Sequence, residues 1–326
     1  MRLWLREKGE SKMDTMQILS VVVFLAVMVA IISEKIHRTV AAVAGGVILV
    51  ILRVLSVDDA VSYIDFSTIG VLIGMMLFVA VVRNSGLFEY VAIKAAKIAK
   101  GNPWKIMLLF TILTAVLSAF LDNVTTVLLV GPMAIAITGI LGIDPVPFLL
   151  AQILASNIGG TATLIGDPPN IMIGSQAGLS FMDFVMNTGV AVVFIMIALC
   201  LSFYFVFGRK LVVAPEKMEA VMQLDENKSI KDHGLLVKSV VMIVVVVLAF
   251  IFHSTIGIDS CIIALGSATI MMLIGKQDIE ETILGVEWST ILFFVGVFVF
   301  VCGMQQTGII TLLGNGLVSL TGGNAM

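Results

Sequence analysis

Two polar clusters interrupt the apolar stretches of this chain, and the first contains a carboxylate. Asp122 and Asn123 are followed closely by the hydroxyl residues Thr125 and Thr126. A carboxylate at membrane depth is costly, so it normally faces a cavity, where it pairs with a cation or carries a proton. The cluster therefore predicts a re-entrant hairpin over 104–141 with its tip near the membrane centre. An ordinary surface loop between two full helices is the alternative interpretation.

The second cluster, between Ser156 and Asn170, combines glycines with adjacent prolines. Glycine lets a helix unwind and turn its carbonyl groups outward, and proline lacks the N–H donor that would restart the helix. Broken helices survive at membrane depth where protein or water covers them, and transporters use them to present carbonyls and helix ends to ions. The pattern predicts a broken helix over 146–177. A plain surface turn over 166–170 is the alternative.

Both clusters are rich in oxygen ligands suited to a hard cation such as Na⁺. Asp167 is expected to bind a cation or to titrate, and Gly166 helps the chain unwind. We expect no cofactor besides a coupling Na⁺ or H⁺, with Asn123, Asn157 and Asp167 as candidate Na⁺ ligands. The candidate substrate- and ion-binding residues are Asp122, Asn123, Thr125, Thr126, Asn157, Gly159, Gly160, Thr161, Thr163, Asp167, Pro168, Pro169 and Asn170.

The composition places these clusters in an integral membrane protein. Of 326 residues, 59% are hydrophobic and 13% are charged, and the mean hydropathy is +1.12. A soluble domain carries about 25% charged residues. Apolar runs long enough to cross a bilayer predict an all-α polytopic fold. The basic residues lie in short loops, so the lipid bilayer is an expected partner and nucleic acid is not.

The predicted organisation is two transmembrane repeats. Sliding the chain by 222 positions aligns Asp65–Gly74 with Glu287–Gly296 without a gap. The predicted parts are an N-terminal segment (1–14), a first transmembrane repeat (15–207), a cytoplasmic inter-repeat loop (208–234) and a partial second repeat (235–326). Within the first repeat we expect a surface helix (86–101), the hairpin and the broken helix. The loop mixes charges of both signs, which indicates a solvated tether.

The two repeats are expected to be inverted, because equivalent loops differ in positive charge. One set of loops holds 14 Lys and Arg residues against 5 on the other side, which predicts an external N-terminus. Arg2, Arg6, Lys8 and Lys12 favour the opposite orientation. The first repeat's length predicts a second repeat reaching about residue 429. A truncated protein that lacks its second hairpin and second broken helix, and does not transport by itself, is therefore expected.

The two motifs resemble the ion transporter superfamily. Leu121–Pro132 (LDNVTTVLLVGP) and Ala155–Ile171 (ASNIGGTATLIGDPPNI) are most similar to the citrate transporter-like branch that holds arsenite permeases, NhaD-type sodium/proton antiporters, the melanosomal P protein and citrate-metal symporters. The resemblance covers nearly the whole chain. It implies an inverted-repeat transporter in which each repeat has three helices, a surface helix, a re-entrant hairpin, a broken helix and a last span. It also implies a homodimer with an elevator or rocking motion.

The chain departs from the superfamily pattern at the site itself. The hairpin tip of the related symporters usually reads Ser-Asn-Thr, whereas here Asp122 takes the Ser position and Val124 the Thr position. Asp167 likewise stands where those symporters have Thr. Two added carboxylates disfavour a multiply charged anion without bound cations. They favour a proton- or sodium-coupled exchanger, or a neutral substrate such as arsenous acid.

The sequence therefore predicts a secondary active transporter of the cytoplasmic membrane that works by alternating access. Asp122 and Asp167 would carry the coupling ion, and Asn123, Asn157, Thr161 and Asn170 would fix ligand geometry. We rank arsenite or inorganic anion transport first, Na⁺/H⁺ antiport second and a carboxylate or sulfate carrier third. A channel and an intramembrane enzyme with an aspartate acid/base pair are the alternatives. An enzyme is not expected, because the chain lacks a nucleophile motif, a metal constellation and a phosphate cradle.

Overall fold

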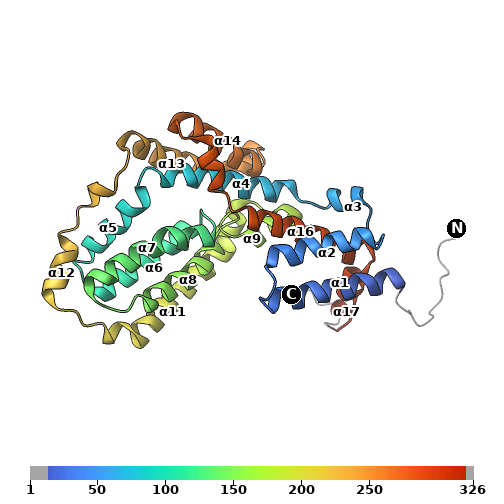
Figure 1. The fold of residues 1–326 in the computed structure, drawn as a ribbon, viewed down its shortest axis with the longest axis horizontal. Coiled ribbons are helices and arrows are strands. Elements are labelled where there is room, and N and C mark those ends of the chain that lie inside the picture. Colours follow the sequence, from blue (N-terminus) through green and yellow to red (C-terminus); the bar gives the residue numbers. More distant parts are fainter. Residues whose placement is uncertain (1–13, 321–326) are drawn as a thin grey trace. The chain divides into compact units, whose positions relative to one another are not determined.

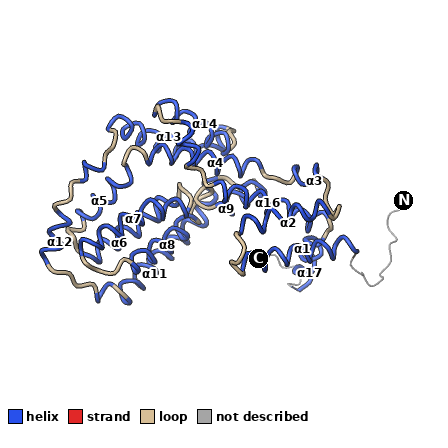
Figure 2. The backbone as a smooth tube through the Cα atoms, in the orientation of Figure 1, coloured by secondary structure: helices blue, strands red, loops and turns tan. Residues whose placement is uncertain are grey.

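The computed structural model describes residues 14–320, and all regular structure in that range is helical (Figure 2). Six described helical segments are long and apolar enough to cross a membrane. They are α1 (Thr15–Ile32), α4 (Phe66–Arg83), α7 (Asn123–Leu141), the run Phe181–Lys210, α13 (His233–Ile256) and α16 (Trp288–Gln306). The predicted polytopic all-α class is confirmed.

The remaining helices are shorter. Four of them are apolar: α2 (Arg38–Ile51), α6 (Pro103–Ser118), α8 (Val146–Gly160) and α14 (Ser260–Gly275). The others are α3 (Val57–Ser62), α5 (Leu87–Ile98), α9 (Pro168–Ala177), α12 (Pro215–Met222), α15 (Ile279–Leu284), α17 (Ile309–Leu320) and the 3₁₀ turns η2 (Gly208–Lys210) and η3 (Glu226–Ser229). The run Phe181–Lys210 joins α10 (Phe181–Phe184) and α11 (Val190–Val206) through the π-helical turn η1 (Val185–Gly189).

The described helices form two compact units. The terminal unit contains the residues up to Phe66 and those from Glu287 onward, and the central unit is Ser67–Val286. In the terminal unit α2 packs against both α1 and α16. The contact of α2 with α16 is very close, because a Cβ at Gly296 would lie 2.6 Å from the Ala42 carbonyl carbon. Small residues allow this approach between membrane helices.

The central unit contains the equivalent contact between α4 and α14. A Cβ at Gly74 would lie 2.5 Å from the carbonyl carbon of Ala264. Gly296 follows Gly74 by 222 positions, and Ala264 follows Ala42 by the same interval. The starts of α2 and α14, α3 and α15, α4 and α16, and α5 and α17 are all separated by this interval. The 222-residue interval thus recurs in helix boundaries and in packing, because α4 packs on α14 as α16 packs on α2. The inverted orientation stays a prediction.

The site-bearing helices belong to the central unit. Helices α6, α7 and α8 lie side by side (Figure 1). Their buried faces meet in an apolar cluster built around Phe110, Ile137 and Phe148. Asp122 begins α7 by accepting a hydrogen bond from a backbone N–H, and Gly142 ends α7 in the left-handed conformation (φ 67°). Both are ordinary helix-terminating devices, and they fix the length of the hairpin's second arm.

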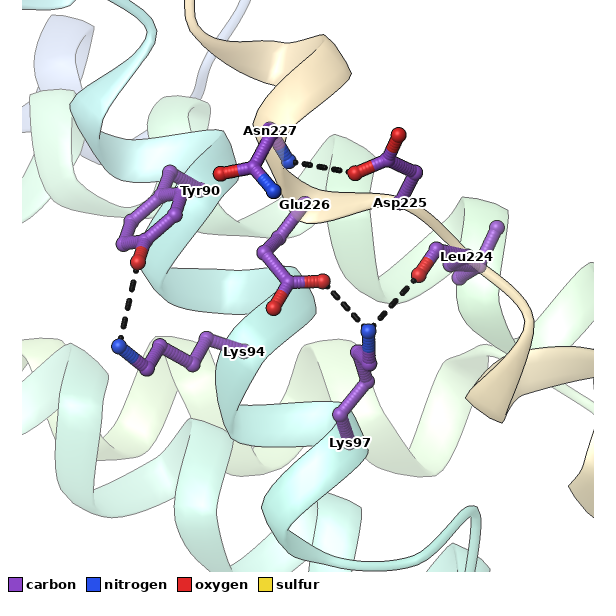
Figure 3. A network of polar contacts seen from close by, with 7 residues as sticks. All are labelled: Tyr90, Lys94, Lys97, Leu224, Asp225, Glu226 and Asn227. Atoms are coloured by element: carbon purple, nitrogen blue, oxygen red, sulfur yellow. Dashed lines mark hydrogen bonds and ion pairs between the residues drawn. The ribbon is translucent and has the colours of Figure 1, made fainter.

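The segment 208–234 packs against α5 and α7 through a few of its residues, and most of its other residues are exposed or half-buried. Val221 of α12 is fully buried in the cluster at the base of the hairpin. Lys97 of α5 contacts Glu226 over 2.5 Å and the Leu224 carbonyl oxygen over 3.1 Å (Figure 3). At Gly101 (φ 69°) a Cβ would collide with the backbone of Met218. The mixed charges of the segment gave no indication of the apolar residues that pack it against α5.

Residues 1–13 and 321–326 lie outside the described part of the chain. Almost all of the predicted N-terminal segment (1–14) falls there. So do four basic residues that bear on orientation, Arg2, Arg6, Lys8 and Lys12.

Candidate functional site

The turn between α6 and α7 holds Asp122 in a defined position. The Asp122 Oδ1 accepts the backbone N–H of Thr125 over 2.8 Å, and the Thr126 hydroxyl donates to the Asp122 carbonyl oxygen over 2.9 Å. The carboxylate therefore lies at the positive end of the α7 dipole, where negative charge is favoured. Asp122 is half-buried and Thr126 is buried. The depth of this tip in the membrane remains a prediction.

The segment between α8 and α9 is a folded break. Residues 161–167 leave the helical path, and Pro168 begins α9. The Thr163 hydroxyl donates to the Ala119 carbonyl oxygen and accepts the Gly166 N–H over 3.2 Å. The Asn170 Nδ2 donates to the carbonyl oxygens of Thr163 (2.9 Å) and Gly160 (3.3 Å). These bonds pair backbone groups that the break would otherwise leave without partners.

The turn between α6 and α7 contacts the last turn of α8 as well as the break. The Asn123 Nδ2 donates to the Asn157 Oδ1 over 2.8 Å, and the Ser118 hydroxyl donates to the Ser156 carbonyl oxygen over 2.6 Å. A Cβ at Gly159 would overlap the backbone of Ala115 on α6. Gly159 lies inside α8, so this glycine serves close helix packing and not the unwinding that the sequence suggested.

The two carboxylates of the site interact. Asp167 is half-buried at the start of α9, makes no side-chain capping hydrogen bond there, and lies close enough to Asp122 for the two charges to interact electrostatically. Within residues 14–320 neither carboxylate has an ion-pair partner. Two neighbouring carboxylates without a basic partner favour a bound cation or a retained proton.

A small cavity adjoins Asp122. Its volume is about 10 Å³, and its other walls are apolar: Val71, Leu72, Met75, Met76, Ile165 and Ile171. A cavity of this size holds about one water molecule. It accommodates a proton carrier or a dehydrated small cation, and it excludes a multi-atom anion.

The structure separates the predicted site residues into two groups. Asn123 and Asn157 are joined by a hydrogen bond beside Asp122, and Asp167 is close enough to Asp122 for the two charges to interact. Thr163 and Asn170 are buried, and their side chains donate hydrogen bonds to backbone carbonyl oxygens in and around the break. The exposed Thr161 donates to the Asn157 carbonyl oxygen over 2.9 Å. The other predicted site residues line the same two segments: Thr125 (half-buried), Gly159 and Gly160 (buried), Pro168 (buried) and Pro169 (exposed).

Sequence reasoning missed two buried polar residues, Thr114 on α6 and Gln152 on α8. Ser118 is fully buried and joins the two helices. One turn below it, Thr114 and Gln152 are buried, and neither side chain has a hydrogen-bond partner among the described residues. The spacing of Thr111, Thr114 and Ser118 (i, i+3, i+7) places them on one helix face, and this spacing was the signal available.

Comparison with known proteins identifies the family. Residues 28–326 match the CitMHS citrate transporter family. An uncharacterized transporter of Mycobacterium tuberculosis (strain H37Rv) is 41% identical over 313 residues, which cover 95% of this chain and 73% of that relative. The 46 kDa membrane protein of Mycobacterium leprae is 37% identical over 315 residues, with the same coverage of both chains. The P protein of Homo sapiens is 30% identical over 379 residues, which cover 92% of this chain and 45% of the P protein.

These relatives confirm the resemblance that the two motifs carried. The match spans the hairpin, the break and the helices on either side of them. The names of the family and of the mycobacterial relative are names of transporters. With six described helical segments long and apolar enough to cross a membrane, the chain is a multi-pass membrane protein that belongs to the CitMHS citrate transporter family.

Proposed function

We propose that this protein is a secondary active transporter that works by alternating access and couples movement of its cargo to H⁺ or Na⁺. The observation that carries the proposal is the contact between hairpin tip and broken helix, which gathers Asp122 and Asp167 beside the Asn123–Asn157 pair. Such a set offers oxygen ligands to a hard cation and a carboxylate pair to a proton. Transporters with broken helices bind their ions at sites of this kind.

The coupling ion is held by the carboxylates and oriented by the amides. Asn123 donates through Nδ2, so its Oδ1 is the amide oxygen that remains for a cation. Bringing a cation between Asp122 and Asp167 removes their mutual repulsion, so cation binding favours approach of the tip and the break. Loss of the cation favours their separation. This reciprocal preference is what alternating access requires of a coupling site.

The charge of the site limits the cargo. With two carboxylates that have no ion-pair partner within residues 14–320, the site disfavours a bare polyanion and accepts a neutral molecule or a cation. Arsenite, which is neutral as arsenous acid, or another inorganic anion is ranked first. Na⁺/H⁺ antiport is second. A carboxylate such as citrate, after which the family is named, or sulfate is third and would need a bound cation to screen its charge. We place the protein in the cell membrane as a homodimer.

The proposal is tested with the full-length protein in inside-out vesicles and a fluorescent pH-gradient probe. Na⁺, arsenite and citrate with a divalent cation are added separately. One of these solutes is expected to change the fluorescence of the probe. Asp122→Asn and Asp167→Asn are each expected to abolish that change. Asp144→Asn, the same change at an exposed loop residue, serves as the matched control and is expected to respond normally. A full response from both site variants would refute coupling at this site.

A current measurement separates a carrier from a channel. A channel passes current down the gradient of the permeant ion alone, whereas an exchanger moves one ion against another. If the protein exchanges Na⁺ for H⁺, vesicles loaded with Na⁺ and diluted into Na⁺-free medium are expected to take up protons. Sustained Na⁺ current without proton movement would assign the protein to the channel alternative.

A further inference from the structure

A polar pocket lies in the central unit and borders the second predicted cluster at Leu164. Its volume is about 270 Å³, and it lies where α9 and α13 end and where α4 and α14 begin. Its polar wall includes Ser67, Ser175, Ser254, His253 and Asp259. Ser254 and Asp259 are exposed and Ser67 is half-buried, so the pocket opens at the helix ends. We refer to it as the serine vestibule.

The serine vestibule and the small cavity beside Asp122 share two walls. Val71 and Ile171 line both of them. These side chains are only 1% and 3% exposed. The two spaces therefore meet at Val71 and Ile171, and Asp122 lines only the smaller one.

The two helices that carry Val71 and Ile171 change character along one face. On α4, Ser67, Val71 and Met75 follow one another at i, i+4 and i+8, so they lie on one side of the helix. Ser67 lines the vestibule, Val71 lines both spaces, and Met75 lines the cavity beside Asp122. On α9, Ser175 and Ile171 are likewise one turn apart, with the serine in the vestibule. On both α4 and α9, one helix face therefore passes from a serine that lines the vestibule to an apolar residue that lines both spaces.

The charged group of the vestibule suits a cation. Asp259 Oδ1 accepts hydrogen bonds from the Ser67 hydroxyl and from the Cys261 N–H, each over 2.8 Å. The second carboxylate oxygen and the surrounding hydroxyls are oxygen ligands. An acidic group at the mouth of a low-dielectric passage raises the local concentration of cations. The His253 Nδ1 contacts the Phe250 carbonyl oxygen over 2.8 Å, which leaves the Nε2 atom of this vestibule residue for another partner.

We propose that the serine vestibule is the entrance through which the coupling cation or proton reaches Asp122, with Val71 and Ile171 as its narrow point. This inference rests on the proposed coupling role of Asp122. Because the inner cavity holds about one water, the route passes a proton or a dehydrated monovalent cation. An oxyanion or a carboxylate does not fit.

The test uses Ag⁺ as a small thiol-reactive cation, because thiolate is a strong ligand for soft metals. The full chain carries Cys200→Ala, Cys261→Ser and Cys302→Ala, with one new cysteine at Met75→Cys beside Asp122. After timed exposure to Ag⁺, the protein is denatured and its free thiol is counted with a maleimide dye. The matched control is Val81→Cys, another buried position of α4 that lines neither space.

Met75→Cys is expected to react with Ag⁺ at least about tenfold faster than Val81→Cys, since thiol reactivity follows access. A bulky cationic methanethiosulfonate reagent is expected to react with Ser254→Cys but not with Met75→Cys. Val71→Phe is expected to slow the Ag⁺ reaction at Met75→Cys and to leave that at Ser254→Cys unchanged. Equal rates at Met75→Cys and Val81→Cys, or no effect of Val71→Phe, would overturn the route.

The role of Asp259 has its own variant. Asparagine is as good a helix cap as aspartate, so Asp259→Asn keeps the start of α14 and removes only the charge. It is expected to slow the Ag⁺ reaction at Met75→Cys severalfold at low ionic strength and to lose this effect at high salt. An unchanged rate at low salt would remove Asp259 from the route. Because these readouts need no transport, failure of the vesicle assay with normal Ag⁺ access would refute the proposed function and leave the route standing.

Discussion

The side-chain amide of Asn123 donates to the amide oxygen of Asn157 over 2.8 Å, across 34 positions of the chain. This bond joins the first residue of α7 to the last turns of α8. The hairpin tip and the broken helix therefore form one assembly and not two separate motifs. The predictions below separate residues that hold this assembly together from residues that bind the ion.

The Asn123–Asn157 pair is expected to matter more for ion binding than for stability. Because Asn123 is half-buried and Asn157 is exposed, loss of their bond costs about 1 kcal/mol or less. Asn123→Ala and Asn157→Ala are each expected to weaken Na⁺ or substrate binding about tenfold, and the double variant about as much as either single one. Isothermal titration calorimetry in detergent measures the binding, and scanning calorimetry in detergent measures the stability. Asn187→Ala, at another exposed asparagine, is the control, and fully additive losses would contradict a shared role.

Gly159 is expected to be sensitive to a single added methyl group. A Cβ there overlaps the Ala115 backbone, which cannot move aside as a side chain can. Gly159→Ala should lower the free energy of unfolding by about 1–3 kcal/mol. Gly139→Ala has open space around the new Cβ and should gain up to about 1 kcal/mol of helix propensity. Thermal unfolding in detergent compares the two, and equal shifts would argue against the close α6–α8 contact.

Thr163 is expected to stabilise the break through its hydroxyl. Thr163→Val keeps the shape and leaves the Ala119 carbonyl oxygen and the Gly166 N–H without this partner. The cost should be about 1–3 kcal/mol, because these groups are buried. Thr161→Val, at an exposed position two residues earlier, should cost clearly less. Hydrogen exchange at residues 161–167 should rise only in the Thr163 variant, and unchanged exchange there would count against this role.

The contact between α5 and the inter-repeat segment is expected to depend on pH. The hydrogen bond from Lys97 lowers the pKa of Glu226 below its ordinary value of 4.5. A carboxyl group whose pKa is lowered on folding stabilises the folded state above the unfolded pKa, and this contribution is lost as the pH falls through the folded pKa. Protease cleavage within 208–234 should therefore accelerate as the pH falls from 5 towards the lowered pKa.

Glu226→Gln should remove most of that acceleration, because the amide carries no titrating charge. Glu219→Gln, at an exposed residue of α12 in the same segment, should keep it. An acid-tolerant protease supplies the readout, with cleavage of an unfolded peptide as the reference for enzyme activity. The same pH profile in all three proteins would show that the Lys97–Glu226 contact does not hold the segment.

Local and periodic features were readable from the sequence. Long apolar runs predicted the membrane helices, since hydrophobic length alone decides which segments can cross a bilayer. Gly166, Pro168 and Pro169 predicted the break before α9, because backbone freedom and a missing N–H act on the residue itself. The interval of 222 residues predicted equivalent helices, which the structure then showed in the paired starts of α4 and α16.

Contacts between distant residues were decided by the tertiary structure. Nothing local distinguishes Gly159, which packs against Ala115, from Gly139, which faces open space. Nor does the mixed charge of 208–234 reveal that Val221 is buried against the hairpin. Hydropathy and backbone propensity belong to single residues and short windows, whereas a site depends on which side chains meet. The sequence by itself therefore determined that a helix breaks near a carboxylate. Only the tertiary structure decided that the broken helix and the hairpin tip lie next to each other, because that contact joins residues far apart in the chain.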